Sequence, residues 1–125
     1  MSETQKTVLI AEDDAFIKRA YVDSLTRAGY EVLTASDGVE ALDVARSQSP
    51  DLILLDLMMP VKNGFEFLEE ACADESIKNI PVIILSNLGQ DSDIKKCQEM
   101  GAKDYMIKSN NSTKDVVEKV AKFLT

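Results

Sequence analysis

Five short apolar runs alternate along the chain with stretches of helical period. The runs lack in-out alternation, which is typical of strands covered on both faces, so they predict a parallel sheet between two layers of helices. The predicted strands are Val8 to Ala11, Val32 to Ala35, Leu52 to Leu55, Val82 to Leu85 and Tyr105 to Ile107. This alternation predicts an α/β fold, a three-layer doubly wound (βα)5 sheet of the flavodoxin-like type with strand order 2-1-3-4-5.

Helical periodicity fills the intervals between the runs. Asp14 is placed to cap the first helix, and the third is expected to begin near Gly64. Cys72 and Cys97 fall at helical positions where a small buried hydrophobe is expected. The apolar face of the first helix is expected to contain Phe16, Ile17, Ala20, Tyr21, Leu25 and Ala28.

Length and charge narrow the range of functions. The chain of 125 residues is expected to form a single domain over residues 1–125 with no output domain. The net charge of -8 and the lack of a basic cluster argue against nucleic acid as a direct partner. No apolar run could cross a bilayer or serve as a signal peptide, so a cytoplasmic location without membrane insertion is expected. The sequence contains no histidine, which excludes histidine-based catalysis and the usual zinc sites.

Candidate site residues follow four of the five apolar runs. Glu12 and Asp13 follow the first run, Asp56 the third, Ser86 the fourth and Lys108 the fifth. Because parallel strands end at one edge of a sheet, these side chains are expected to converge beside the first and third strands. Carboxylates in one crevice repel each other unless a cation offsets them, and oxygen ligands of this kind suit Mg²⁺ or Mn²⁺. A lysine and a hydroxyl beside the metal suit phosphoryl oxygens.

Three of the polar groups also have a purely structural interpretation. Lys108 could be only a counter-ion to the acids, and Ser86 could satisfy a nearby backbone group. Tyr105 could cover the core while its hydroxyl stays in water. The combination of groups, rather than any one of them, predicts a site for a divalent cation and a phosphoryl group.

Four motifs occur in order along the chain: Ala11-Glu-Asp-Asp14, Asp56-Leu-Met-Met-Pro60 with Gly64, Ser86, and Tyr105-Met-Ile-Lys108. Together they resemble the receiver domain of two-component response regulators, in the stand-alone form of the chemotaxis regulators. The resemblance runs from about Thr7 to Leu124, nearly the whole chain. Four site elements on a matching strand-helix pattern are far more specific than a short acidic motif.

The resemblance implies that the protein is a phosphoacceptor rather than an enzyme. Asp56 would take a phosphoryl group from the phosphohistidine of a histidine kinase or phosphotransfer protein, forming an aspartyl phosphate. Asp13, Asp56 and the backbone carbonyl of Met58 would hold Mg²⁺ or Mn²⁺, and Glu12 would act through a bound water. With the metal bound, phosphorylation by small donors and autodephosphorylation would also occur at Asp56.

The resemblance also implies roles around the acceptor. Ser86 and Lys108 would bind two phosphoryl oxygens, and Ser86 with Tyr105 would form a switch in which the tyrosine turns inward on phosphorylation. The face of the protein that binds an unknown downstream partner would then change its affinity, in a monomer or a phosphorylation-dependent dimer. Met58 and Leu88 border the path of the attacking water in the family. Neither side chain can orient water, which predicts slow autodephosphorylation.

Two positions depart from the family pattern. Ser109 follows Lys108 where the family usually has proline, and Asn87 follows Ser86 where a small residue is usual. The loop after Lys108 therefore need not share the family's turn. The side chain of Asn87 could either narrow the access to Asp56 or contact the phosphoryl group.

Other classes of function are a phosphorylation-independent interaction module, a flavodoxin-like cofactor binder and an aspartyl-phosphate phosphatase. The intact acid cluster and Lys108 argue against the module. No phosphate-binding glycine loop follows the first strand, which argues against the cofactor binder. Met58 stands where such a phosphatase commonly needs a second acid, which argues against the enzyme.

Overall fold

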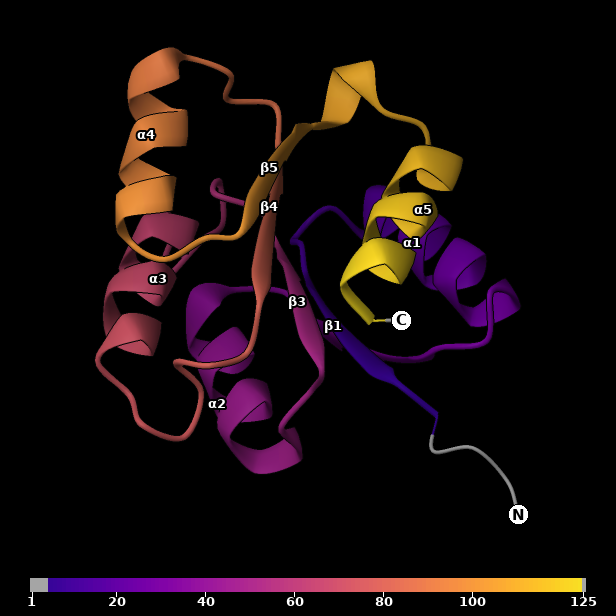
Figure 1. The fold of residues 1–125 in the computed structure, drawn as a ribbon, viewed down its shortest axis with the longest axis horizontal. Coiled ribbons are helices and arrows are strands. Elements are labelled where there is room, and N and C mark those ends of the chain that lie inside the picture. The colour runs from indigo at the N-terminus through magenta and orange to yellow at the C-terminus, as the bar shows by residue number, and fades with distance from the viewer. Residues whose placement is uncertain (1–4, 125) are drawn as a thin grey trace.

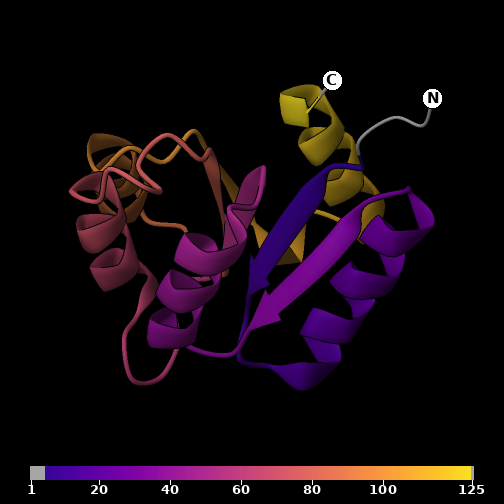
Figure 2. The ribbon, with the colours of Figure 1, turned by 90° about the horizontal axis from the view of Figure 1, so that it is seen from below.

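The protein is a five-stranded parallel sheet with helices on both faces, in a computed structural model that describes residues 5–124. The strands are β1 (Thr7–Ala11), β2 (Glu31–Ala35), β3 (Leu52–Leu55), β4 (Val82–Ser86) and β5 (Asp104–Ile107). Their order is β2-β1-β3-β4-β5, which confirms the predicted fold class, and Figure 2 shows β1 and β2 side by side. The central strand β3 is buried along its whole length, as its uninterrupted apolar sequence predicts.

The helices form two layers that enclose the sheet (Figures 1 and 2). One layer contains α1 (Ala15–Arg27) and α5 (Thr113–Leu124), and the other contains α2 (Gly38–Gln48), α3 (Gly64–Cys72) and α4 (Asp91–Glu99). A short 3-10 helix, η1 (Lys108–Asn110), joins β5 to α5. The sheet divides the core into two apolar clusters, one under each layer. Among the described residues, no helix is long and apolar enough to cross a membrane.

Local sequence determines where several helices begin and end. Asp14 caps α1 as predicted, because its carboxylate accepts two backbone N–H groups of the first turn at 2.9 and 3.0 Å. Ser112 and Asp115 form a capping box at α5, with bonds of 2.9 and 3.1 Å. Gly29 and Gly101 follow α1 and α4 with φ of +101° and +99°, a conformation that glycine adopts without a steric cost.

Three residues predicted to be buried are exposed. Phe16 lies in the first turn of α1, close to the carboxyl ends of the strands, and is 86% exposed. The apolar pattern of the helix extends into this turn, but the side chain has no surface of the sheet to pack on. Ala28 is exposed after the last turn of the same helix. Cys72 is exposed at the end of α3, so only the prediction for Cys97 is correct. Burial raises the pKa of the Cys97 thiol to about 11.

Val61 has a strained backbone conformation in the loop between β3 and α3. Its φ is +67°, which β-branched residues rarely adopt because Cβ approaches the carbonyl oxygen. The amide of Lys62 donates to the carbonyl of Pro60 at 2.7 Å and closes a three-residue turn around Val61. Because the side chain is 81% exposed, packing does not offset this strain.

Replacing Val61 with asparagine is expected to raise the free energy of unfolding by roughly 1 kcal/mol, because asparagine tolerates positive φ far better than valine. Urea denaturation measures the difference. Val39→Asn is a matched control, since Val39 is 41% exposed but lies inside α2 without positive φ. No gain is expected at Val39, and a loss of stability on Val61→Asn would contradict the prediction.

Candidate functional site

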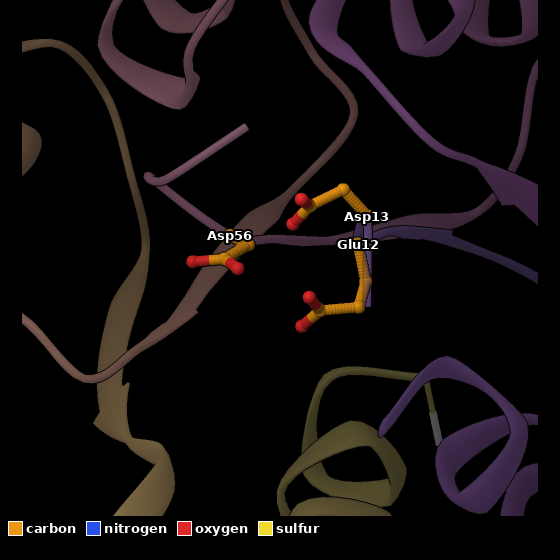
Figure 3. Close-up of side chains that lie close together, drawn as sticks. All are labelled: Glu12, Asp13 and Asp56. Carbon is orange, nitrogen blue, oxygen red and sulfur yellow. The ribbon is translucent and has the colours of Figure 1, made fainter. Parts of the chain in front are cut away.

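The three predicted acidic residues meet at the carboxyl edge of the sheet. The parallel register pairs Ala11 with Leu55, so the residues that follow them in the chain are neighbours in space. Glu12, Asp13 and Asp56 each offer a carboxylate oxygen within 4.8 Å of the others. Figure 3 shows Glu12 and Asp13 on either side of the end of β1, with Asp56 opposite them. The structure therefore brings together the acids that the strand-end rule places at one edge.

Both carboxylate oxygens of Asp56 have a hydrogen-bond donor. The backbone N–H of Met58 donates to Oδ1 at 3.2 Å, and the Nζ of Lys108 donates to Oδ2 at 2.9 Å. The backbone N–H of Asp56 donates to the carbonyl of Ala11 at 3.0 Å, which holds the start of the loop against β1. The residue is only 6% exposed, so its carboxylate has a fixed position in the crevice.

Lys108 neutralises part of the acid cluster. Its ammonium group donates to Glu12 as well as to Asp56, and its side chain is 10% exposed. Burial raises the pKa of Glu12, although the hydrogen bond from Lys108 opposes this effect. Burial alone would lower the pKa of Lys108, but the bonds to Glu12 and Asp56 outweigh it and raise that pKa above its ordinary value. The lysine is therefore held in its charged form beside two buried acids.

The charges and ligand atoms of the crevice fit a divalent cation. Three carboxylates carry three formal negative charges and Lys108 carries one positive charge, so a net charge of two negatives remains among the described residues of the cluster. Asp13 is the exposed member of the cluster and lies at its mouth. Carboxylate oxygens without sulfur or imidazole are the ligands of hard ions such as Mg²⁺ and Mn²⁺. The residues present thus match the predicted metal.

Ser86 and Tyr105 both bond to the backbone of Leu88. The Ser86 hydroxyl, fully buried at the end of β4, accepts the N–H of Leu88 at 3.3 Å. The Tyr105 hydroxyl donates to the carbonyl of Leu88, and its ring packs against the core. Burial raises the pKa of Tyr105 to about 12. The hydroxyl of Tyr105 is therefore bonded within the protein, which excludes the alternative in which it only stays in water.

The two departures from the receiver pattern are hydrogen-bonded to each other. Oδ1 of Asn87 accepts the backbone N–H of Ser109 at 3.1 Å. Proline has no N–H, so the usual family residue could not make this bond. No cis peptide bond occurs among residues 5–124, including the one between Lys108 and Ser109. Sequence reasoning treated the two positions separately, although their joint departure from the pattern was a signal that they interact.

A pocket of about 460 Å³ opens beside the acid cluster. Its lining residues are Asp13, Leu57, Met58, Met59, Asn63 and Phe65. Met58, two residues after Asp56, is 62% exposed, whereas Leu57 is buried. The carboxylate cluster is therefore reached from solvent past an apolar rim on this side.

Comparison with known proteins places these features in a family. The family model for the response regulator receiver domain matches residues 8–121. The protein of Guillardia theta named "Probable transcriptional regulator ycf27" is 40% identical over 106 residues, which cover 85% of this chain and 41% of that protein. The chain thus spans less than half the length of the ycf27 relatives that it matches. The polar-differentiation response regulator DivK of Brucella ovis is 34% identical over 103 residues, covering 82% of this chain and 84% of DivK.

Solved structures match the fold over nearly the whole chain. The chemotaxis protein CheY4 of Vibrio cholerae superimposes with a TM-score of 0.89 at 28% identity, covering 96% of this chain and 99% of CheY4. The receiver domain of the sensor histidine kinase PA1611 from Pseudomonas aeruginosa, which holds a magnesium ion in its active-site cleft, gives a TM-score of 0.87 at 26% identity. That match covers 97% of this chain and 98% of the PA1611 domain. Since the family model covers residues 8–121 and the fold agrees, the chain belongs to the receiver domain family of two-component response regulators.

Proposed function

We propose that the protein is a phosphorelay receiver in which Asp56 accepts a phosphoryl group from the phosphohistidine of a histidine kinase or phosphotransfer protein. Receiver domains are phosphoacceptor signalling modules that bind Mg²⁺ and interact with such kinases or phosphotransfer proteins. The observation that carries the proposal is the ammonium of Lys108, which bonds the buried carboxylates of both Asp56 and Glu12. Because this ammonium lies 2.9 Å from an oxygen of the acceptor carboxylate, it can turn to a phosphoryl oxygen that is added there.

The chemistry is a displacement at phosphorus. An oxygen of the Asp56 carboxylate forms a bond to phosphorus while the bond from phosphorus to the imidazole nitrogen of the donor breaks, and that nitrogen keeps the electron pair. Since the carboxylate is the nucleophile in its ionised form, no general base is required, and catalysis consists of positioning and charge neutralisation. Hydrolysis of the acyl phosphate by water returns Asp56 to its carboxylate form.

Residues around Asp56 have distinct tasks in this proposal. Lys108 exchanges a carboxylate partner for a phosphoryl oxygen, because its ammonium already lies 2.9 Å from Asp56. Ser86 supplies a hydroxyl to a second phosphoryl oxygen from the end of the neighbouring strand. When bound, Mg²⁺ would be held by Asp13, Asp56 and the carbonyl of Met58, with Glu12 acting through water, and would supply positive charge to the phosphoryl oxygens.

Ser86 and Tyr105 are proposed to transmit the signal through Leu88. The Ser86 hydroxyl accepts the N–H of Leu88, and the Tyr105 hydroxyl donates to its carbonyl. When the Ser86 hydroxyl turns to a phosphoryl oxygen, it releases the N–H of Leu88, and the loop that holds Tyr105 can move. The affinity for a downstream protein then changes on the face formed by α4, β5 and α5. A beryllofluoride-bound structure in which Ser86, Leu88 and Tyr105 are unmoved would remove this role.

The phosphoacceptor assignment predicts a single phosphoryl adduct on the wild type after incubation with Mg²⁺ and acetyl phosphate, and none on Asp56→Asn. Intact-mass measurement detects the adduct. Asp14→Asn is a matched control, because Asp14 adjoins the acid cluster but caps α1, and asparagine caps a helix equally well. The control is expected to be phosphorylated like the wild type.

Other outcomes of this experiment would identify another function. A wild type without any adduct would favour a phosphorylation-independent interaction module. Turnover of a phosphomonoester by the wild type would favour a phosphatase. An adduct that persists in Asp56→Asn would place the acceptor on another residue.

The aspartyl phosphate is expected to decay slowly, and the double variant Met58→Asn with Leu88→Glu is expected to accelerate its loss roughly tenfold or more. The N–H of Met58 donates to Asp56 and the N–H of Leu88 donates to Ser86, so both residues adjoin the phosphoryl site, but neither side chain can orient water. Decay is followed by intact mass after removal of the donor. Met58→Leu with Leu88→Met is the control and should leave the rate unchanged, and an unchanged rate in the polar variant would show the prediction to be wrong.

A further inference from the structure

The side chain of Asn87 extends the pairing of β4 with β5 beyond the last backbone pair. Ser86 and Ile107 form the final pair of the ladder, after which β4 continues into a loop and β5 into η1. Oδ1 of Asn87 then accepts the N–H of Ser109 at 3.1 Å. The residue after the Ser86 hydroxyl is thus bonded to the residue after the Lys108 ammonium.

This bond is the connection between the Lys108 turn and the strand that carries Ser86. Within residues 5–124, the other backbone-directed hydrogen bonds of the turn are internal: Asn111 donates its N–H to the carbonyl of Lys108 at 3.3 Å and its side-chain amide to that of Ile107 at 2.9 Å. Neither bond reaches β4. Lys108 therefore lies between two residues that are tied to this side of the sheet, Ile107 through the ladder and Ser109 through Asn87.

We propose that Asn87 is a positioning residue for phosphoryl transfer, which holds the Lys108 backbone at a fixed distance from Ser86. This role rests on the proposed phosphoacceptor function, in which the hydroxyl and the ammonium must bind two oxygens of one phosphoryl group. The carbonyl oxygen of Asn87 accepts the N–H of Ser109, and in this role the side chain acts through the Lys108 turn rather than by touching the substrate. Residue 109 must then keep its N–H, which explains why serine is compatible with Asn87 here and proline is not.

The size of the effect follows from the exposure of the bond. Asn87 and Ser109 are both exposed, so water can replace the bond when the side chain is removed. Asn87→Ala is expected to slow phosphorylation by acetyl phosphate roughly three- to tenfold. This factor corresponds to the net free-energy contribution of one hydrogen bond. Global stability should stay nearly unchanged.

A double-mutant cycle with Lys108→Ala tests the role. If Asn87 acts by placing Lys108, then Asn87→Ala should have no further effect on the phosphorylation rate once Lys108 has been removed. Hydrogen exchange of the Ser109 amide, measured by NMR without donor or metal, should speed up in Asn87→Ala while urea denaturation shows an unchanged midpoint. Asn111→Ala is the matched control, because it removes a side-chain bond of the same turn that does not reach β4. Its phosphorylation rate should match the wild type.

The outcomes separate the positioning role from the function on which it rests. Equal slowing by Asn87→Ala with and without Lys108 would mean that Asn87 contacts the phosphoryl group itself and would overturn the positioning role. A wild-type rate in Asn87→Ala would also overturn it, while leaving Asp56 as phosphoacceptor. A wild type that takes no phosphoryl group would overturn both.

Discussion

Replacing Lys108 with alanine is expected to slow the phosphorylation of Asp56 roughly a hundredfold or more, the usual cost of removing one preorganised donor from a developing oxyanion. Lys108 is the cation that bonds the acceptor carboxylate, at 2.9 Å, in a crevice with three acids. Without it, the incoming phosphoryl oxygens meet negative charge that no other cationic side chain within residues 5–124 is bonded to. Initial rates with acetyl phosphate and saturating Mg²⁺, read by intact mass, measure the effect.

The same variant is expected to be less stable at neutral pH without divalent cations, by roughly 3 kcal/mol, because two buried carboxylates lose their counter-ion. Burial raises the pKa of Glu12 above its ordinary value of 4.5, and the bond from Lys108 opposes this rise. In the variant that opposition is gone, so the pKa should lie higher still. A carboxyl with a raised folded-state pKa favours folding at low pH and loses that contribution as the pH rises through the folded-state pKa.

The loss of unfolding free energy in Lys108→Ala, relative to the wild type, should therefore be largest near pH 7. It should shrink as the pH falls toward the ordinary pKa of Glu12. Urea denaturation across this range measures it. Lys119→Ala is the control, because Lys119 pairs with Asp104 at 2.7 Å on the surface, where a salt bridge contributes about 1 kcal/mol or less. Two results would contradict the role given to Lys108. One is a phosphorylation rate of Lys108→Ala within tenfold of the wild type, and the other is a loss of unfolding free energy that grows on acidification.

The strands of the sheet could be located from apolar runs almost to the residue. The bounds of β3 agree with the prediction, while β1, β2 and β5 begin one residue earlier and β4 ends one residue later. The added residues are Thr7, Glu31, Asp104 and Ser86. They join the ladder through backbone hydrogen bonds, which do not depend on side-chain polarity. An apolar pattern therefore detects the apolar part of a strand and misses its polar ends, even where such an end is buried as Ser86 is.

The acid cluster was predictable because it follows from topology alone. Residues that end neighbouring parallel strands must meet, so Glu12, Asp13 and Asp56 needed only the strand order to be placed together. The bond between Asn87 and Ser109 was not predictable in this way, since it joins two loops whose paths no periodicity determines. The same holds for the positive φ of Val61, which arises from the closure of its turn.

Gly64 shows how the fold sets the position of the acceptor. Its N–H donates to the carbonyl of Leu57 at 3.1 Å, so the start of α3 packs directly on the backbone that follows Asp56. A Cβ at this position would lie 2.5 Å from the carbonyl oxygen of Asp56 and 2.7 Å from the Cα of Leu57. Both neighbours are backbone atoms, which cannot turn aside as a flexible side chain can. Alanine at residue 64 must therefore displace either α3 or the acceptor.

Gly64→Ala is expected to lower the free energy of unfolding by roughly 1–3 kcal/mol, the usual cost of forcing extra volume into a packed site. It should also slow phosphorylation of Asp56 by up to about a hundredfold, because a displacement near 1 Å disrupts a reacting geometry. Urea denaturation and acetyl phosphate kinetics measure the two effects separately.

A control must separate the loss of stability from the movement of Asp56. Gly101→Ala serves this purpose, because a Cβ there would meet no atom within 4 Å and its cost arises only from the φ of +99°. Gly101 follows α4, before β5 begins, and lies away from the strand ends that carry the acids. The Gly101→Ala variant should be less stable than the wild type but keep the wild-type phosphorylation rate, under conditions where both it and Gly64→Ala are folded. If Gly64→Ala also keeps that rate, the contact between α3 and the backbone of Asp56 does not determine where the acceptor lies.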